Sequence, residues 1–405
     1  MRLLMQLCVI GGLAVATIQV RAETNELHLP VILPLTGSGA FLGLEEQQAL
    51  RIIETLTNRN GGINGRPLKF DISDDRSSPQ DGVQIATRNL SAGPIAIFGS
   101  ALVAICNATA PLVRNGPVQF CFSPAIHPVA GSFVFTAGVS STDTYNVILR
   151  YFRQRGLTRL AYIVSTDASG QDAEKAVEEA LRLPENSGVA MKVRAHFNPA
   201  DLSVSAQMAA IADAAPQALL VLTSGTPSGT AFKGLVQAGI DVPTATPYSN
   251  MTFAQMDQYA AFLPRQLYFP SGQWPQGGGQ SDDEPAVARA KEEFYAAYEQ
   301  DGHRPDVGAT LAWDPAAIVI AALRVVGPDA TPAALRAQIA GMAGFAGLNG
   351  LYDFRKNPQR GLDESDVVMA RWDRGAHDWV VVSRPGGAPM ADEIVSQDHT
   401  RTGAP

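Results

Sequence analysis

The sequence predicts an α/β protein with two lobes, each built on a doubly wound, mainly parallel sheet. Of the 405 residues, 46% are hydrophobic and 17% charged, a balance typical of globular chains that bury a core. Short apolar runs alternate with amphipathic stretches in two successive series, which is the pattern of right-handed βαβ units. At about 100–200 residues per domain, the length predicts two or three packed units.

The first series starts with residues 27–35, a short apolar run that ends in the turn Thr36-Gly37-Ser38-Gly39 and predicts a buried strand. Residues 44–58 follow with apolar side chains spaced as on one face of a helix, and the glycines at 61 and 62 end it. The rest of this series is expected as strand 68–72, helix 80–90, strand 95–98, helix 102–113 and strand 118–122.

A second series of the same kind begins near residue 142. It is expected as helix 143–155, strand 160–164, helix 173–183, strand 191–195, helix 205–214, strand 218–222, helix 229–238 and strand 244–248. Residues 270–285 are rich in Gly, Gln, Ser and Pro, which predicts a loop or a crossing between lobes. Helices 287–298 and 307–326 and strands 366–372 and 379–382 follow, and we expect a flexible tail over residues 386–405.

Residues 1–22 have the pattern of a cleaved signal peptide. Arg2 precedes an uncharged run over residues 3–20, and Val20-Arg21-Ala22 places small or medium residues at the positions that signal peptidase recognises. Glycine and polar residues within the run weaken the alternative of a membrane anchor. We therefore expect cleavage after Ala22 and a periplasmic protein, with no later segment long and apolar enough to insert in a membrane.

The chain is acidic, with 39 Asp and Glu against 31 Lys and Arg and a formal charge of −8. Removal of the leader takes away two arginines and makes the exported chain more acidic still. Since the Lys and Arg residues are not clustered, the composition argues against nucleic acid and anionic membranes as partners. Cys106 and Cys121 remain after export, and the sequence leaves them as either a disulfide or two buried thiols.

Sequence motifs for catalysis are absent. There is no Gly-x-Ser-x-Gly elbow, phosphate loop or His-Glu-x-x-His, and the six histidines are isolated in the sequence, so we expect no enzyme, metal or other cofactor. Gly37-Ser38-Gly39 with Gly43 partly matches a dinucleotide-binding turn, although its last spacing is one residue too long. An NAD-type oxidoreductase is therefore a minor alternative.

Small polar residues follow three of the predicted strands, at the positions where open parallel sheets bind ligands. Ser100 is placed to cap the helix expected to begin at Leu102, and a cap is compatible with binding of a carboxylate. Phe41 and Tyr248 are either aromatics at the lip of a cleft or core residues. The three loops are Gly99-Ser100-Ala101, Ser123-Pro124-Ala125-Ile126-His127 and Thr223-Ser224-Gly225-Thr226.

Several motifs in order resemble the Leu/Ile/Val-binding family of periplasmic solute-binding proteins. They are Leu33-Pro34-Leu35-Thr36-Gly37, Asn60-Gly61-Gly62-Ile63-Asn64-Gly65-Arg66-Pro67-Leu68, Asp74-Asp75, Pro79, Phe98-Gly99-Ser100 and Ser123-Pro124-Ala125. The resemblance extends over nearly the whole chain after the leader. It implies the type I periplasmic-binding-protein fold, in which two α/β lobes joined by three crossings close on a ligand and dock on an ABC permease.

The resemblance also implies roles for individual residues. Ser100 and the backbone of Ala101, Ala125 and Ile126 fall at the family's ligand-carboxylate site. Asn250 stands where amino-acid binders present an acid for the ligand's ammonium, with Asp143 or Asp167 as alternatives. Ser169 stands where the family often has tyrosine, and Thr223, Ser224 and Gly225 match the loop of the second lobe that covers the ligand. Ser38, Phe41, Ser123, His127 and Tyr248 complete the predicted binding set.

We therefore expect a monomeric periplasmic binding protein of an ABC uptake system. Its ligand would be a small carboxylate-bearing solute: a branched-chain amino acid or a similar compound, an amide, or an aromatic or other organic acid. An alternative from another class is a periplasmic sensory subunit that signals to a membrane kinase. Lobe 1 is predicted to contain residues 23–138 and 272–345, and lobe 2 residues 139–271 and 346–385.

Overall fold

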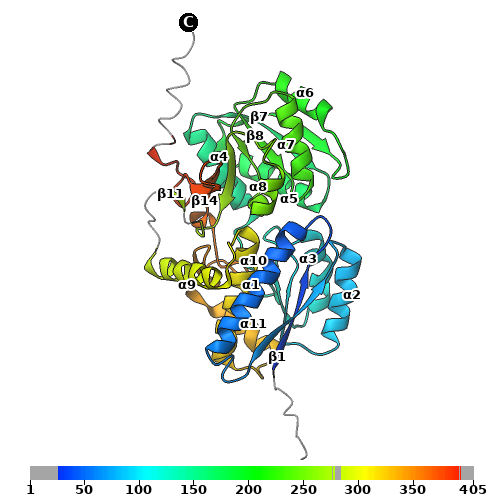
Figure 1. The fold of residues 1–405 in the computed structure, drawn as a ribbon, viewed down its shortest axis with the longest axis vertical. Coiled ribbons are helices and arrows are strands. Elements are labelled where there is room, and N and C mark those ends of the chain that lie inside the picture. The colour runs from blue at the N-terminus through cyan, green and yellow to red at the C-terminus, as the bar shows by residue number, and fades with distance from the viewer. Residues whose placement is uncertain (1–25, 276, 279–283, 392, 394–405) are drawn as a thin grey trace, which may run out of the picture.

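The computed structural model describes residues 26–275, 277–278, 284–391 and 393, and these form two α/β lobes along one long axis (Figure 1). Each lobe has its own sheet with helices on both faces, which confirms the predicted fold class. The predicted signal peptide lies outside the described residues, and so does most of the predicted tail.

Lobe 1 is built on a five-stranded parallel sheet with the order β2–β1–β3–β4–β5. Val31 and Leu33 of β1 face one apolar cluster and Ile32 faces another, because successive side chains of a strand point to opposite faces. Helix α1 belongs to the first cluster, and α2 and α3 to the second. The bounds are β1 (Leu27–Leu33), α1 (Ala40–Arg59), β2 (Leu68–Asp74), α2 (Pro79–Leu90), β3 (Ala96–Gly99), α3 (Val103–Thr109), η1 (Ala110–Val113), β4 (Val118–Cys121) and β5 (Val134–Thr136).

Lobe 2 is built on an eight-stranded sheet with the order β11–β15–β14–β10–β9–β8–β6–β7. The strands from β10 to β7 are parallel. Strand β14 runs antiparallel to both β10 and β15, and β11 pairs in parallel with β15. Helices α4 and α5 pack on one face and α6 and α7 on the other. The first elements are α4 (Ser141–Gln154), β6 (Arg159–Ser165), α5 (Ala168–Leu181), η2 (Pro184–Asn186), β7 (Ala190–Phe197), α6 (Ser205–Asp213) and β8 (Ala218–Leu222). The others are α7 (Pro227–Gln237), β9 (Thr244–Ala245), η3 (Tyr248–Asn250), α8 (Phe253–Gln258), β10 (Leu267–Ser271), β11 (Gly277–Gly278), η4 (Glu364–Asp366), β14 (Val368–Asp373) and β15 (Asp378–Val381).

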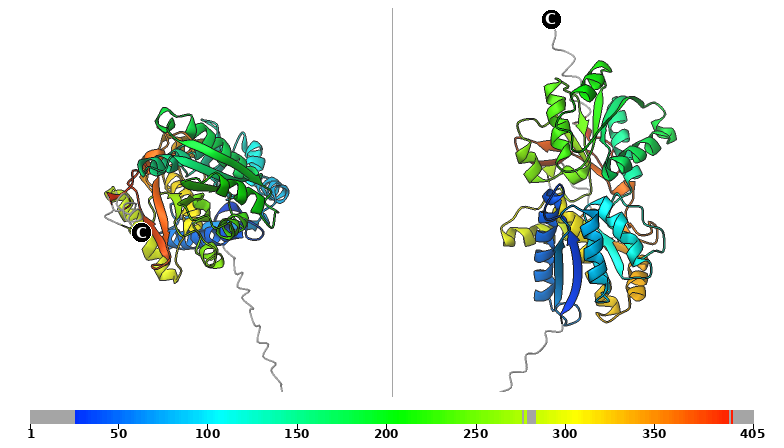
Figure 2. Two further views of the ribbon diagram at one scale, coloured as in Figure 1. Left: turned by 90° about the horizontal axis from the view of Figure 1, so that it is seen from above. Right: turned by 90° about the vertical axis from the view of Figure 1, so that its right-hand side faces the viewer.

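Figure 2 shows the two lobes from two further sides. The order of the elements in the two sheets takes the chain between the lobes three times. After β10 and β11 it returns to lobe 1 as α9 (Pro285–Asp301), α10 (Val307–Val326), α11 (Pro332–Gly341) and the hairpin β12 (Ala343–Ala346)–β13 (Leu351–Asp353), before β14 enters the second sheet. The predicted lobe limit after residue 345 falls inside this hairpin, whose Tyr352 donates a hydrogen bond to the carbonyl of Ala137 at 3.2 Å. The exact limits of the lobes stay a prediction.

Helix α10 differs from one expectation. Among the described residues it is the one helix with the length and hydropathy to cross a membrane, although no stretch after the leader was expected to have both. Most of the helix is buried against α1 and other elements of lobe 1. Its high hydropathy is that of a core helix surrounded by protein on nearly all sides.

Short elements account for most other differences from the sequence-based expectations. The strand expected over residues 244–248 is the two-residue β9 followed by η3, and the predicted loop at 270–285 contains the end of β10 and all of β11. Strand β5, helices α8 and α11 and the β12–β13 hairpin were not predicted. Apart from the ten-residue α11, the unpredicted elements have two to six residues, and runs this short show little periodicity unless they are continuously apolar, as β8 is.

The start of the predicted flexible tail packs on lobe 2. Among the described residues of the tail, Glu393 accepts a hydrogen bond from Tyr151 at 3.1 Å and lies 3.5 Å from the buried guanidinium of Arg155. A polar sequence suggested solvent exposure here, but these charges are paired. The flexibility expected from residue 386 onward stays a prediction, and these contacts show that Glu393 lies against lobe 2.

Cys106 of α3 and Cys121 of β4 form a disulfide, with their Cα atoms 6.1 Å apart. The sequence left a disulfide and two thiols as alternatives, and the structure has the disulfide. The bond joins the helix and the strand that lie beneath the lobe 1 side of the cleft described next.

Candidate functional site

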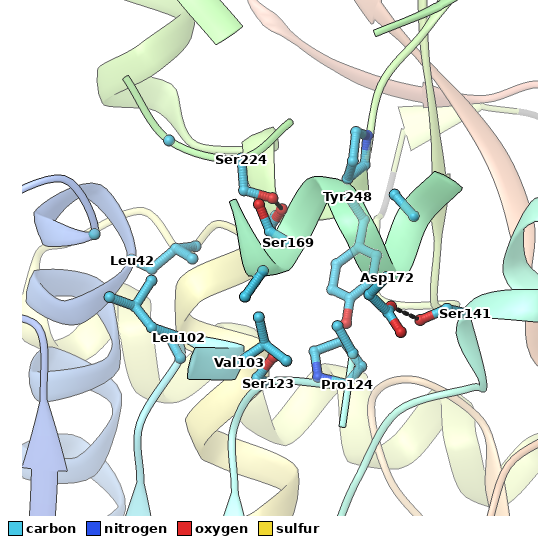
Figure 3. A pocket seen from close by; sticks show the side chains of 18 of the residues that line it. Leu42, Leu102, Val103, Ser123, Pro124, Ser141, Ser169, Asp172, Ser224 and Tyr248 are labelled. Atoms are coloured by element: carbon cyan, nitrogen blue, oxygen red, sulfur yellow. Dashed lines mark hydrogen bonds between the residues drawn. The ribbon is translucent and has the colours of Figure 1, made fainter. Parts of the chain in front are cut away.

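A cavity of about 240 Å³ lies between the lobes, at the carboxyl ends of parallel strands of both sheets (Figure 3). Lobe 1 contributes the start of α1, the start of α3 and the loop after β4. Lobe 2 contributes the first turns of α4 and α5 and the loops after β8 and β9. Most of the predicted ligand-binding residues line it: Ser38, Phe41, Ala101, Ser123, Ala125, Ser169, Ser224, Gly225 and Tyr248. Their contact with a ligand stays a prediction.

Ser100 does not line the cavity, contrary to prediction. Its side chain is 1% exposed and contacts the carboxyl group of Asp75 beneath the wall. Helix α3 begins at Val103 with Leu102 as its N-cap, so Ser100 does not occupy the N-cap position, although its hydroxyl accepts a hydrogen bond from the Leu102 N–H at 3.3 Å. Gly99 has a φ of +92°, and a Cβ there would overlap the carbonyl of Ile32. The tight turn at Gly99 therefore leaves Ser100 inside lobe 1.

Asn250 and Thr223 also lie behind the wall. The Asn250 side chain is fully buried; its Nδ2 donates to the Thr223 carbonyl at 2.8 Å and its Oδ1 accepts from the Gly225 N–H at 3.0 Å. This amide holds the loop that presents Ser224 and Gly225 to the cavity. Neither Asn250 nor Thr223 is among the residues that line the cavity, although both were predicted to contact the ligand.

Ile126 and His127 turn away from the cavity, again contrary to prediction. Ile126 packs in the apolar cluster that contains both disulfide cysteines. His127 lies on the lobe 1 loop and crosses to lobe 2, where its Nε2 is 2.6 Å from Oδ1 of Asp172. Asp172 also accepts a hydrogen bond from Ser141 at 2.5 Å, so the carboxylate lies between the hydroxyl and the imidazole. This order differs from a catalytic triad, in which the histidine contacts the nucleophile directly.

Two carboxylates line the cavity, both on lobe 2. Asp167 is the N-cap of α5, and its Oδ1 accepts hydrogen bonds from the Gly170 N–H and the Ser169 hydroxyl, both at 2.9 Å. Asp172 lies one turn further along the same helix. Asp167 was one of the alternatives to Asn250, whereas Asp172 was not predicted and Asp143 is not among the lining residues.

Two tyrosines contribute hydroxyls to the same end of the cavity. Burial and the nearby charge of Asp172 raise the pKa of Tyr145 and of Tyr248, so both remain protonated at neutral pH. Neither hydroxyl has a hydrogen-bond partner among the described residues. Each can therefore donate a hydrogen bond to a ligand.

Five of the lining residues that were not predicted have a spacing that could have identified them. Ser141, Thr144 and Tyr145 lie at i, i+3 and i+4 in the first turns of α4. Asp172 and Ala173 lie at i+3 and i+4 from the predicted Ser169 in α5. Residues with this spacing share one helix face. The other lining residues not predicted are mostly apolar: Gly39, Leu42, Ser77, Leu102, Val103, Ala104, Pro124, Val139, Ala168, Pro247, Ser249, Gln255, Pro270 and Leu311.

The charged side chains of the wall are all acidic, and all lie on lobe 2. Asp167 and Asp172 are the charged lining residues, and no Lys, Arg or His of the described chain lines the cavity. Within the same described residues, no group of His, Cys, Asp and Glu is arranged to hold a metal ion. The wall offers backbone amides, hydroxyls, two carboxylates and apolar side chains, which can bind and orient a small polar molecule.

The periplasmic binding protein family matches residues 26–377. The chain belongs to this family. Its members bind ligands, and this membership outweighs the minor oxidoreductase alternative suggested by the glycine-rich turn. Membership also implies export to the periplasm, as the sequence predicts. A search of curated proteins gives no match.

Solved structures of periplasmic binding proteins share the fold at low sequence identity. An extracellular ligand-binding receptor from Rhodopseudomonas palustris HaA2 has 20% identity and a TM-score of 0.78, with 88% of this chain and 99% of that chain covered. The branched-chain amino acid transporter substrate-binding protein LivJ from Streptococcus pneumoniae, in complex with isoleucine, has 16% identity and a TM-score of 0.73 (88% and 99% covered). An ABC transporter solute-binding protein from R. palustris, in complex with benzoate, has 17% identity and a TM-score of 0.73 (90% and 97% covered).

Proposed function

We propose that this protein is the periplasmic substrate-binding subunit of an ABC uptake system and captures a small carboxylate-bearing solute between its lobes. The observation that carries the proposal is the cavity itself, because its wall is divided between two lobes joined by three crossings. A ligand that contacts both lobes stabilises the closed arrangement over the open one. Closure on a ligand would supply the signal that a permease recognises.

The composition of the wall supports a ligand with one polar end and an apolar body. Phe41, Leu42, Leu102 and Leu311 provide apolar surface. Ser123 and the backbone around Ala101 and Ala125 provide small donor groups on lobe 1. Isoleucine and benzoate, the ligands of two structural relatives, are both carboxylates with apolar bodies. A ligand of this class matches a wall that combines these apolar side chains with small donor groups on lobe 1.

The test is a thermal-shift and calorimetric screen of the purified mature protein. The panel contains branched-chain amino acids, benzoate and other aromatic acids, short aliphatic acids, the amides of these compounds, and neutral sugars. A ligand at 100 times its Kd stabilises the folded state by about 2.7 kcal/mol, which gives a clear rise in Tm. The proposal fails if neutral sugars raise the Tm and no carboxylate does.

The uptake role needs a separate measurement. The bound protein is added to membranes that contain the permease and ATPase encoded beside its gene, and ATP hydrolysis is recorded. Stimulation that requires both ligand and protein supports transport. Ligand-dependent phosphorylation of a membrane kinase, without stimulated ATP hydrolysis, would instead support the sensory alternative.

A further inference from the structure

Arg360 lies behind the wall of the cavity, in the loop between β13 and η4, and its guanidinium donates to backbone carbonyls. Its Nη1 donates to the oxygens of Pro124 at 2.9 Å and Gly138 at 3.1 Å, and its Nη2 donates to that of Ile126. Within the described chain it forms no salt bridge with a carboxylate. The side chain therefore joins the lobe 1 loop to the first crossing between the lobes.

Two of the carbonyls that Arg360 contacts, those of Pro124 and Ile126, belong to peptide units of the Ser123–His127 loop. The peptide group of the Pro124 carbonyl ends in the N–H of Ala125, and that of Ile126 ends in the N–H of His127. A positive charge hydrogen-bonded to a peptide oxygen polarises the whole unit and strengthens its N–H as a donor. Ala125 lines the cavity, and its N–H has no acceptor among the described residues.

The polarisation of the Ala125 N–H matters for anion binding because of the charges around Arg360. Burial lowers the pKa of Arg360, while Tyr248, Asp172 and Asp143 act in the opposite direction. A guanidinium nonetheless stays protonated in proteins. The wall itself carries two carboxylates, which repel an anionic ligand, and the Arg360 charge behind Ala125 opposes that repulsion.

We propose that Arg360 is the positioning residue that makes this cavity select an anion over its neutral isostere. It fixes the Ser123–His127 loop against the crossing and directs positive potential through the Ala125 N–H into the cavity. The inference rests on the proposed function, since it assigns the charge selection of the same site. The ligand class it predicts is a carboxylate rather than the corresponding amide.

The test compares Arg360→Gln, Arg360→Lys and a matched control, Arg374→Gln. Arg374 also donates to backbone carbonyls, those of Leu263 and Pro264, but it does not line the cavity. The probes are benzoate with benzamide and isoleucine with isoleucinamide, measured by calorimetry. Arg360→Gln is expected to weaken the acid at least about tenfold and the amide less than about threefold. Arg360→Lys keeps the charge and is expected to retain more of the acid-over-amide preference, and Arg374→Gln to retain all of it.

Equal weakening of acid and amide by Arg360→Gln would show that Arg360 only supports the fold, and would overturn the inference. A second measurement needs no ligand: the NMR chemical shift of the Ala125 amide proton in the ligand-free protein. This chemical shift should differ from the wild-type value in Arg360→Gln and equal it in Arg374→Gln. A wild-type value in both variants also overturns the inference. Failure of the wild-type protein to bind any carboxylate overturns the proposed function, while the Ala125 shift still decides whether Arg360 polarises the loop.

Discussion

The two walls of the cavity differ in what they present to a ligand. Lobe 1 presents backbone and small or apolar side chains, such as Ala101, Val103 and Ala125, whereas lobe 2 presents Asp172, Tyr248 and a series of hydroxyls. Backbone amides can bind one end of any anion, but tyrosines and carboxylates discriminate between ligands through their exact positions. We infer that lobe 1 recognises a common ligand group and lobe 2 determines which ligand is bound.

The walls also differ in how they are held. The lobe 1 wall rests on the Cys106–Cys121 disulfide, while the lobe 2 loop is held by the hydrogen bonds of Asn250. A covalent bond fixes α3 against β4 whether or not a ligand is bound. The polar network of lobe 2 can be rearranged one hydrogen bond at a time.

The largest expected effect is on the stability of lobe 1. Replacement of both Cys106 and Cys121 by alanine removes a cross-link between residues separated by 15 positions, and loop entropy predicts a loss of about 3 kcal/mol. Urea unfolding without reductant measures it. Reductant should lower the stability of the wild-type protein to that of the double variant and leave the variant unchanged. If wild type and the double variant have equal free energies of unfolding without reductant, then the disulfide does not make the lobe 1 wall more stable.

The second effect concerns buried acids beneath the lobe 1 wall. Burial raises the pKa of Asp75 to about 6 and, together with the nearby carboxyl of Asp75, raises the pKa of Glu46 further above its usual range. The folded state thus holds its proton more tightly than the unfolded chain, so Asp75 makes the protein less stable as pH rises from about 4 to 6. Asp75→Asn removes this loss. The free energy of unfolding of the variant, relative to that of wild type, should therefore rise by about 2 kcal/mol between pH 4 and pH 7.

Chemical unfolding of both proteins at several pH values measures this difference. If the difference in free energy of unfolding between Asp75→Asn and wild type is the same at pH 4 and pH 7, then Asp75 titrates alike in the folded and unfolded chains.

How much of the structure the sequence could predict differs between the regular elements and the loops that form the walls. The long helices α1 and α10 were located within a few residues, because their apolar spacing repeats over several turns. The short strand β8 was located because it is a continuous apolar run with clear boundaries. Loops at strand ends indicated the cavity as a place. The inward or outward direction of Ser100, Asn250 and His127 depends on turn geometry and on partners distant in the chain, which a single sequence does not specify.

The third effect tests the close approach of the lobes. Gly225 of lobe 2 has a φ of +75°, and a Cβ there would lie 2.7 Å from the carbonyl oxygen of Ser38 in lobe 1. Gly225→Ala should hinder closure and weaken ligand binding about tenfold, equivalent to about 1.4 kcal/mol. Gly239→Ala is the matched control, since Gly239 has a φ of +67° and open space around its Cβ. Equal affinities of the two variants would mean that this contact does not limit closure.

The smallest effect concerns the bond that joins the two walls directly. His127 is on the lobe 1 loop and Asp172 on α5 of lobe 2, so their 2.6 Å contact exists only when the lobes are together. The histidine side chain is 55% exposed, and such partly exposed pairs contribute less than about 1 kcal/mol. His127→Ala should therefore weaken ligand binding only about threefold in calorimetry, by favouring the open arrangement.

His303→Ala is the control for the loss of a similarly exposed imidazole, because His303 pairs with Asp301 within lobe 1 and spans no cleft. Its affinity for the ligand should equal that of the wild type. Since His127 does not line the cavity, the loss in His127→Ala should be the same for every ligand that closes the lobes, whereas a substitution at Tyr248 should change the order of ligand preference. If His127→Ala binds as tightly as wild type, or alters the preference among ligands, then closure does not depend on this bond and the division between a general wall and a selective wall is wrong.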